Sequence, residues 1–217
     1  MADPATRLAD VREQIARAAK AARRKVDDVT LVAVTKQRSA SEIEPLIAAG
    51  VTDFGENRVQ EAADKWPSLR EAHPGSRLHM IGRLQSNKAD EAVRLFDTIH
   101  SVDRISLLDA LAAAADKAGR HPNIYVQVNI GAEEQKGGVA IDDLATLLEK
   151  VRASALPLAG LMAMPPLGQQ PGPYFALLAE LARRHGVAGL SMGMSSDYPT
   201  AVMLGATAIR VGSALFE

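Results

Sequence analysis

Short apolar runs alternate with amphipathic stretches along the chain, and this alternation most constrains the fold. The runs have the length and partly β-branched composition of buried parallel strands. They cover residues 31–35, 53–55, 78–82, 98–102, 124–130, 158–163, 189–192 and 208–211. The stretches between them place apolar residues three and four positions apart, as at Leu144, Leu147 and Leu148, which is typical of helices. Strands alternating with helices predict a parallel sheet, and eight such units close into a barrel. We therefore expect an α/β fold, a (β/α)8 TIM barrel.

The length of the chain allows one such barrel. Its 217 residues fit one large α/β unit, so residues 1–217 are predicted to form a single domain. An additional helix predicted over residues 5–22 would cover the barrel where no full helix follows the eighth strand. The Pro- and Gly-rich run 165–173 is interpreted as one irregular loop between a strand and a helix.

Composition excludes several classes of function. The 25 basic and 26 acidic residues are interleaved, so no strong field would attract nucleic acid or an anionic membrane. The absence of cysteine excludes disulfides and thiolate metal sites, and the histidines form no HExxH pair, so no metal is expected. No apolar run approaches the roughly 20 residues of a membrane span, and the N-terminus lacks the apolar core of a signal peptide. We expect a soluble, cytoplasmic protein.

One lysine stands where the first predicted strand becomes a loop. Lys36 directly follows residues 31–35, and chemistry in such barrels lies on the loops after the C-terminal ends of the strands. A lysine there can act as a nucleophile toward an aldehyde, although position alone favours a solvated strand terminator. The amine attacks best when unprotonated, so a mostly buried site that lowers its pKa would assist.

The loops after the seventh and eighth strands contain small residues. Ser195, Gly212 and Ser213 suit a phosphate, because the backbone N–H groups of such residues can approach the anion. Each is also an ordinary turn or cap residue, and Ser195 with Asp197 could simply start a helix. The occurrence of two such loops together favours a phosphate site.

Three further polar residues lie in or next to predicted strands. Arg210 interrupts an apolar strand and needs an acceptor, either a protein carboxylate such as Glu56 or the ring nitrogen or phosphate of a ligand. Asn57 is either a helix N-cap or a ligand contact. His79 is interpreted as a hydrogen-bonded structural residue. We expect the polar residues after the second, third and fifth strands to face the same mouth as Lys36.

Seven segments, taken in order, resemble the pyridoxal phosphate homeostasis protein family. They are LVAVTKQRS around Lys36, DFGENRVQE from Asp53, HMIGRLQSNK from His79, QVNIGAEEQKGG from Gln127, GLMAMPP from Gly160, SMGMSSDY from Ser191 and IRVGSALF from Ile209. The first, third and sixth are the most specific, and the resemblance runs from about residue 31 to 216. It implies a fold-type III barrel like the N-terminal domain of alanine racemase, with pyridoxal 5'-phosphate (PLP) as the cofactor.

The resemblance also implies which residues hold the cofactor. Lys36 matches the lysine that carries PLP as a Schiff base, and Arg210 matches the residue that faces the pyridine nitrogen. Asn57 falls in the motif near the cofactor. A permanently cationic arginine at the ring nitrogen disfavours ring protonation, which weakens the electron sink that transamination and decarboxylation exploit.

The implied phosphate contacts are Ser195 and the backbone at Gly212 and Ser213. The sequence departs from the family pattern here in two ways. Position 213 is serine where threonine is common, and the chain ends at Phe216 and Glu217, where family members usually continue with a glycine and a short tail. Serine should preserve the N–H and hydroxyl groups, whereas the short end could either loosen a cover over the phosphate or merely reflect truncation.

The resemblance implies a carrier or buffer for PLP, with no catalytic residue assigned. Its expected partners are PLP and apo forms of PLP-dependent enzymes, and a monomer is expected. One alternative is a weak amino-acid racemase or another fold-type III PLP enzyme. Alanine racemases use a tyrosine from a second domain as an acid/base, and Tyr125, Tyr174 and Tyr198 offer no obvious substitute. Another alternative is a barrel that has lost PLP and acts through protein contacts.

Overall fold

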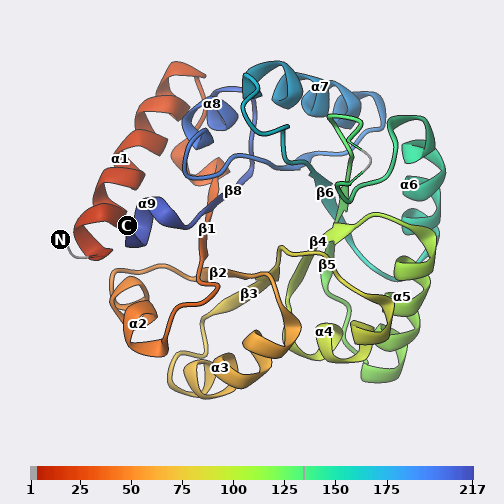
Figure 1. Cartoon of the computed structure of the whole chain (residues 1–217), viewed down its shortest axis with the longest axis horizontal. Coiled ribbons are helices and arrows are strands. Elements are labelled where there is room, and N and C mark those ends of the chain that lie inside the picture. Colours follow the sequence, from red (N-terminus) through yellow and green to blue (C-terminus); the bar gives the residue numbers. More distant parts are fainter. Residues whose placement is uncertain (1–3, 134) are drawn as a thin grey trace.

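The strands close into a barrel in sequence order (Figure 1). The computed structural model describes residues 4–133 and 135–217. Within them every neighbouring pair of strands is parallel, so the predicted (β/α)8 barrel is confirmed. The strands are β1 (Thr30–Val34), β2 (Asp53–Glu56), β3 (Arg77–Met80), β4 (Thr98–Val102), β5 (Asn123–Gln127), β6 (Leu158–Met162), β7 (Gly189–Ser191) and β8 (Ala208–Val211).

Helices surround the barrel and shield its outer face (Figure 1). The α-helices are α1 (Pro4–Ala21), α2 (Ala40–Ala48), α3 (Val59–Ala72), α4 (Ala89–Leu95), α5 (Ile105–Ala118), α6 (Leu144–Ala153), α7 (Pro171–Arg184), α8 (Tyr198–Met203) and α9 (Ser213–Phe216). Short 3-10 turns are η1 (Val26–Asp28), η2 (Ser86–Lys88) and η3 (Ile141–Asp143). Buried aliphatic and aromatic side chains of strands and helices form one continuous core.

The register of the strands sets which loops are neighbours. Ala33 of β1 pairs with both Phe54 of β2 and Val211 of β8, and β8 joins β7 through Ala208 and Ser191. Because all strands run in the same direction, their C-terminal ends lie on one rim of the barrel. The loops after β1, β2, β7 and β8 therefore lie next to one another.

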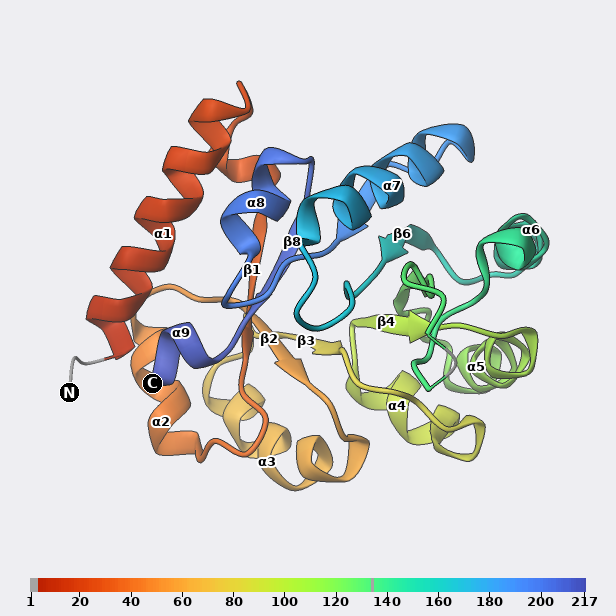
Figure 2. The ribbon, with the colours of Figure 1, turned by 45° about the horizontal axis from the view of Figure 1, so that its top comes forward.

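Helix α1 covers the side of the barrel that would otherwise be open next to the short α8 and α9 (Figure 2). Its buried residues Leu8, Val11 and Ile15 recur at three- and four-residue spacing and form an apolar stripe. Arg12 donates to the Ala49 carbonyl at 3.0 Å, which ties α1 to the end of α2. This covering role is the one predicted for the helix over 5–22.

Some predicted boundaries are wrong by a few residues. The fifth strand ends at Gln127 instead of residue 130, because Val128 leaves the ladder to form an isolated bridge with Val139. The loop predicted over 165–173 ends earlier, since Pro171 begins α7. Proline is tolerated there because the first turn of a helix needs no N–H partner. No helix of the described residues is long and apolar enough to cross a membrane.

Candidate functional site

A cavity of about 820 Å³ opens at the C-terminal rim of the barrel, and we call it the Lys36 pocket. Its lining comes from segments that are far apart in the sequence but follow neighbouring strands. The structure brings together in this pocket all the cofactor residues predicted from sequence, Lys36, Asn57, Ser195, Arg210, Gly212 and Ser213. Their roles toward a ligand stay predictions, and the geometry below states what each can offer.

Lys36 lies in a tight turn directly after β1. The Arg38 N–H donates to the Thr35 carbonyl at 3.1 Å, and Gln37 between them has φ of 59°, a left-handed conformation that non-glycine residues rarely adopt. The side chain of Lys36 is exposed, as its position at a strand end alone favours, and it does not lie in the mostly buried site that would assist attack by the amine. Strand β1 ends at Val34, and Lys36 lies two positions beyond it. The turn therefore extends past the rim of the barrel, where the pocket meets solvent.

A buried ion pair supports this turn from below. Glu56, fully buried at the end of β2, accepts from the Thr35 hydroxyl at 2.7 Å and from the Trp66 indole N–H at 2.9 Å. Lys65 of α3 lies 2.7 Å from Glu56 and donates to the carbonyls of Thr35 and Arg38 at 2.8 and 3.1 Å. The carbonyls on both sides of Lys36 are therefore held by one ammonium group.

The last residues of the chain close the outer wall of the pocket. The Arg38 guanidinium lies 4.8 Å from the centre of the Phe216 ring and 3.0 Å from the Glu217 carboxylate. Phe216 and Glu217 both line the Lys36 pocket. Arg38 thus joins the loop after β1 to the segment after β8.

Ser195 joins the loops after β7 and β8. Its hydroxyl oxygen accepts from the N–H groups of Gly212 at 3.1 Å and Ala214 at 3.2 Å, so its own proton remains available to donate. Of the pair that could start a helix, Asp197 is the N-cap of α8, whereas Ser195 lies before the helix and bonds to the loop after β8. The pocket therefore has a hydroxyl donor at the meeting point of two loops.

The backbone around Ser195 needs a glycine before it. Gly193 has φ of 94°, and a Cβ built on it would lie 2.6 Å from the Cβ of Ala201. The Gly193 carbonyl accepts from the backbone N–H of Arg210 at 3.0 Å, and this bond fixes the loop to β8. The Met194 N–H donates to the Asp197 carboxylate at 2.6 Å, and this bond shapes the turn that presents Ser195.

Arg210 is a buried cation at the floor of the pocket. It is 4% exposed, and burial lowers the pKa of its guanidinium to about 10, so it remains charged at neutral pH. It donates to the Ser191 hydroxyl and to the Ala163 carbonyl at 3.2 Å. Within residues 4–133 and 135–217 no carboxylate lies within ion-pair distance of it. The predicted alternative partner, Glu56, belongs instead to the Lys65 network.

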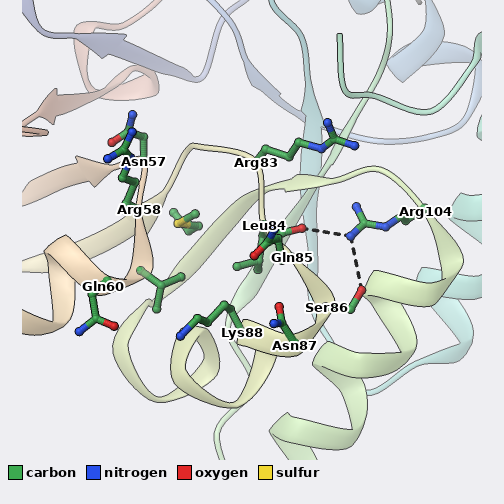
Figure 3. A pocket seen from close by; sticks show the side chains of 12 residues that line it. Asn57, Arg58, Gln60, Arg83, Leu84, Gln85, Ser86, Asn87, Lys88 and Arg104 are labelled. Atoms are coloured by element: carbon green, nitrogen blue, oxygen red, sulfur yellow. Dashed lines mark hydrogen bonds between the residues drawn. The ribbon is translucent and has the colours of Figure 1, made fainter. Parts of the chain in front are cut away.

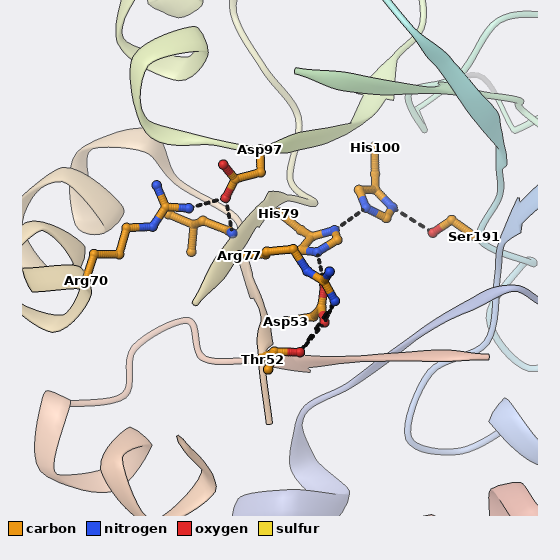
Figure 4. Close-up of polar contacts among 9 residues, drawn as sticks. Thr52, Asp53, Arg70, Arg77, His79, Asp97, His100 and Ser191 are labelled. Atoms are coloured by element: carbon orange, nitrogen blue, oxygen red, sulfur yellow. Dashed lines mark hydrogen bonds and ion pairs between the residues drawn. The ribbon is translucent and has the colours of Figure 1, made fainter. Parts of the chain in front are cut away.

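A chain of buried hydrogen bonds runs through the barrel from Ser191, the partner of Arg210, to Asp53 (Figure 4). The Ser191 hydroxyl lies 2.7 Å from Nδ1 of His100, and Nε2 of His100 lies 2.9 Å from Nδ1 of His79. Nε2 of His79 lies 2.9 Å from Asp53. Because His100 is on β4 and Ser191 on β7, strands that are not neighbours, the chain crosses the barrel interior. His79 is hydrogen-bonded as predicted.

The two ends of this chain fix the direction of its hydrogen bonds. Burial would raise the pKa of Asp53, but hydrogen bonds from His79, Arg77 and Thr52 outweigh it and hold the pKa below its usual range. Asp53 is thus an acceptor only, and an arginine is a donor only.

The intervening imidazoles transmit this direction. Burial, followed by the charges of His79 and Arg210, lowers the pKa of His100 well below its ordinary value, so His100 is neutral. Every bond of a chain that runs from a donor-only arginine to an acceptor-only carboxylate is satisfied when Ser191 donates to Nδ1 of His100, His100 donates from Nε2 to His79, and His79 donates from Nε2 to Asp53. The oxygen lone pairs of Ser191 then face Arg210.

Asn57 sits between the Lys36 pocket and a second hollow. Its Oδ1 atom is buried and has no hydrogen-bond partner among the described residues, so an interior polar atom is left for a ligand. Arg58, not Asn57, is the N-cap of α3, and the N-cap alternative for Asn57 is wrong. A Cβ at Gly82 would lie 2.2 Å from the Asn57 carbonyl oxygen, so only glycine allows the two loops to approach this closely.

The polar residues expected to share one mouth are in fact divided between two hollows. Arg58, Gln85 and Lys88 line the second hollow and not the Lys36 pocket. Sequence reasoning missed Gln127, at the end of β5, and Met164, which line the Lys36 pocket. The position of a polar residue at a strand end was the signal that could have identified Gln127. Among the described residues no group of three or more His, Cys, Asp or Glu side chains could hold a metal ion.

Comparisons with known proteins agree with this architecture. Residues 7–217 match the family "Alanine racemase, N-terminal domain". The chain is 43% identical over 212 residues to the pyridoxal phosphate homeostasis protein of Deinococcus radiodurans, covering 96% of this chain and 97% of that protein.

Solved structures of known proteins also share this barrel fold. PipY of Synechococcus elongatus, solved with PLP bound, superposes with a TM-score of 0.86 at 39% identity and covers 99% of this chain and 100% of its own. Alanine racemase of Clostridium difficile gives a TM-score of 0.76 at 12% identity, over 99% of this chain and 56% of its own. At that identity the likeness concerns the fold alone.

Proposed function

This chain belongs to the alanine racemase N-terminal domain family, together with the pyridoxal phosphate homeostasis proteins, and from that membership we propose that it binds PLP reversibly and regulates its free concentration. The observation that carries the proposal is Arg210, a buried cation with no carboxylate partner in the described residues, which lines the same pocket as Lys36 and Ser195. Ser191 and Ala163 engage only some of its donors, and the remaining donors favour a further acceptor in the pocket.

The pocket residues fit the three polar groups of PLP. Lys36 offers an amine for covalent attachment to the aldehyde, and its exposed position leaves it accessible to PLP from solvent. Ser195 offers a hydroxyl donor to the phosphate, beside the backbone of Gly212 and Ser213. Arg210 offers a donor to the pyridine nitrogen, which is an acceptor only when it is unprotonated.

Arg210 restricts the chemistry that this site can perform. PLP, when bound, supplies an aldehyde and an electron-withdrawing ring. Arg210 would disfavour a proton on the ring nitrogen, because a cation beside it disfavours a second positive charge. Ser191, whose lone pairs face the guanidinium, keeps Arg210 directed at the pocket. Reactions that require a protonated ring are therefore disfavoured.

The lining of the pocket supports a carrier over an enzyme. Tyr125, Tyr174 and Tyr198, all in the described residues, do not line the Lys36 pocket. Tyr125 instead stacks on His100 at 4.5 Å within the barrel. No tyrosine is thus placed to exchange a proton with a substrate on the face opposite Lys36. We propose that the chain is a cytoplasmic monomer that passes PLP to apo forms of PLP-dependent enzymes.

Two assays on the PLP-loaded protein test this proposal. We expect the loaded protein to restore the activity of an apo PLP-dependent transaminase, and free PLP measured after ultrafiltration to stay low until that acceptor is added. Incubation with L-alanine should give no D-alanine above the rate of free PLP. Turnover of L-alanine that disappears in Lys36→Ala would contradict the carrier role and identify a racemase. Failure to retain any PLP would contradict both.

A further inference from the structure

A second pocket of about 680 Å³ lies beside the Lys36 pocket, and we call it the Arg58 pocket (Figure 3). It is formed by the start of α3 and by the segment between β3 and α4. Asn57 and Arg83 line both pockets, so the two share a wall. The segment from Arg83 to Lys88 belongs to one of the most specific motifs of the sequence, and PLP binding as proposed does not use it.

The lining of the Arg58 pocket is positively charged, and two of its four cations have no carboxylate partner among the described residues. Its charged residues are Arg58, Arg83, Lys88 and Arg104, and no Asp or Glu is among the described residues that line it. Lys88 is paired with Glu91 at 3.0 Å outside the lining. Arg58 and Arg83 are exposed and have no ion-pair partner in the described residues, so both are available to an anion.

Arg104 is held in place before any ligand arrives. Its guanidinium donates to the Leu84 carbonyl at 3.1 Å and to the Ser86 hydroxyl at 3.4 Å, and it lies 2.6 Å from Asp103. Figure 3 shows these bonds on the side of the pocket opposite Arg58. The guanidinium thus loses little side-chain freedom on binding, which favours affinity.

The floor of the Arg58 pocket is apolar. Val59, Met80 and Leu84 line it and are 6%, 1% and 1% exposed. Because these side chains expose little surface, the floor adds an apolar wall more than buried area, and an apolar or aromatic body of a ligand would contact it without losing hydrogen bonds. The cations and the floor together describe a ligand with an anionic end and an apolar body.

We propose that the Arg58 pocket binds a small organic phosphate with an apolar or aromatic body, separately from the Lys36 pocket. Phosphate is favoured over a carboxylate because the pocket offers several guanidinium groups, whose planar donors match several phosphate oxygens at once. The two pockets share Asn57 and Arg83, so the test below fixes the state of the Lys36 pocket while the Arg58 pocket is titrated. The proposal goes beyond PLP carriage and stands whether or not Lys36 carries PLP.

Calorimetric titration with phenyl phosphate tests this site. Phenyl phosphate has the required ring and phosphate and lacks an aldehyde, so it cannot attach to a lysine. Two proteins are titrated: the chain with PLP fixed in the Lys36 pocket by borohydride, and the Lys36→Ala variant. We expect saturable 1:1 binding to the chain whose Lys36 pocket is filled, and up to one further equivalent in Lys36→Ala, where the phosphate contacts around Ser195 are free. Benzoate and phenol should bind the Arg58 pocket at least tenfold more weakly. Failure of PLP attachment would leave the Lys36→Ala titration intact, so the two proposals fail separately.

Single substitutions locate the binding. Arg58→Ala should raise the dissociation constant of phenyl phosphate at least fivefold, since Arg58 lines this pocket alone. Arg17→Ala, an equal loss of charge on exposed α1, should leave it unchanged. Absence of saturable binding, benzoate binding as tightly as phenyl phosphate, or binding that is insensitive to Arg58→Ala would overturn the proposal.

Discussion

Arg210 donates to the hydroxyl of Ser191, and the two residues join the Lys36 pocket to a hydrogen-bond chain that ends at Asp53. A buried guanidinium is usually paired with a carboxylate, because leaving it unpaired is costly. Here the nearest carboxylate along the chain is Asp53, which is separated from Ser191 by three hydrogen bonds. The donors of Arg210 that Ser191 and Ala163 do not engage remain for a ligand in the pocket.

Arg210→Met should separate ligand binding from stability. The substitution removes a charged donor to a pyridine nitrogen, worth about 1.5–3 kcal/mol, so the dissociation constant of PLP should rise at least tenfold. The free energy of unfolding should change by less than about 2 kcal/mol, because the desolvation cost of the charge disappears along with its hydrogen bonds. Absorbance titration and urea denaturation measure the two quantities. Unchanged PLP affinity would contradict the assigned role.

Ser195→Ala should affect phosphate recognition and stability together. The N–H groups of Gly212 and Ala214 lose their acceptor, so the free energy of unfolding should fall by about 1–3 kcal/mol. Binding of PLP should weaken more than binding of pyridoxal, which lacks the phosphate. Ser106→Ala, at an exposed position, is the matched control. An equal loss for the two ligands would argue against a phosphate contact at Ser195.

Lys65→Met should destabilise the turn that carries Lys36. It leaves Glu56 fully buried without its ammonium partner, at a cost of about 3–5 kcal/mol. Glu56→Gln in the same chain should recover part of this loss, because the uncompensated charge is removed. Urea denaturation measures the stability, and hydrogen exchange should be faster at the Arg38 amide. Additive effects of the two substitutions would contradict a direct pair.

Acid should destabilise the apo protein through His100. The folded-state pKa of His100 lies well below its ordinary value of about 6.5, so only the unfolded chain takes up that proton as the pH falls below about 6.5. Stability should then fall with decreasing pH, by up to about 1.4 kcal/mol per pH unit for this group. Urea denaturation of the apo protein between pH 7 and 5 measures this slope. His100→Gln should reduce it, and His121→Gln, at an exposed position, should not.

Asp53 acts in the same direction as His100 but in a lower pH range. Its folded-state pKa lies below the ordinary value, so its contribution to stability is present above about pH 4 and is lost as the pH falls further. Asp53→Asn should flatten the stability curve below pH 4 and leave the slope between pH 7 and 5 to His100. An unchanged acid limb in Asp53→Asn would contradict the hydrogen bonds assigned to this carboxylate.

The barrel could be predicted because its signals are local. Apolar runs and helical spacing are properties of neighbouring residues, and Lys36 was identified because it directly follows such a run. The exposure of Lys36 was not predictable in the same way. It depends on where β1 leaves the ladder, at Val34, and on the turn that Lys65 supports from α3.

Contacts between distant strands could not be predicted. Strands buried on both faces lack the alternation that would tell which side chains point into the barrel. The sequence therefore does not show that Glu56 bonds to Thr35 and Trp66 and not to Arg210. The His100–Ser191 bond joins residues 91 positions apart. A polar residue inside an otherwise apolar strand can indicate a buried hydrogen bond, and His100 and Ser191 are both such residues.

Borohydride reduction of the PLP-loaded protein, followed by peptide mapping with mass spectrometry, tests most directly whether Lys36 is the attachment site. We predict one pyridoxyl group per chain, located on Lys36, and none in the Lys36→Ala variant. Absence of a pyridoxyl group, or label spread over exposed lysines such as Lys20 and Lys117, would contradict the assignment of the Lys36 pocket to PLP.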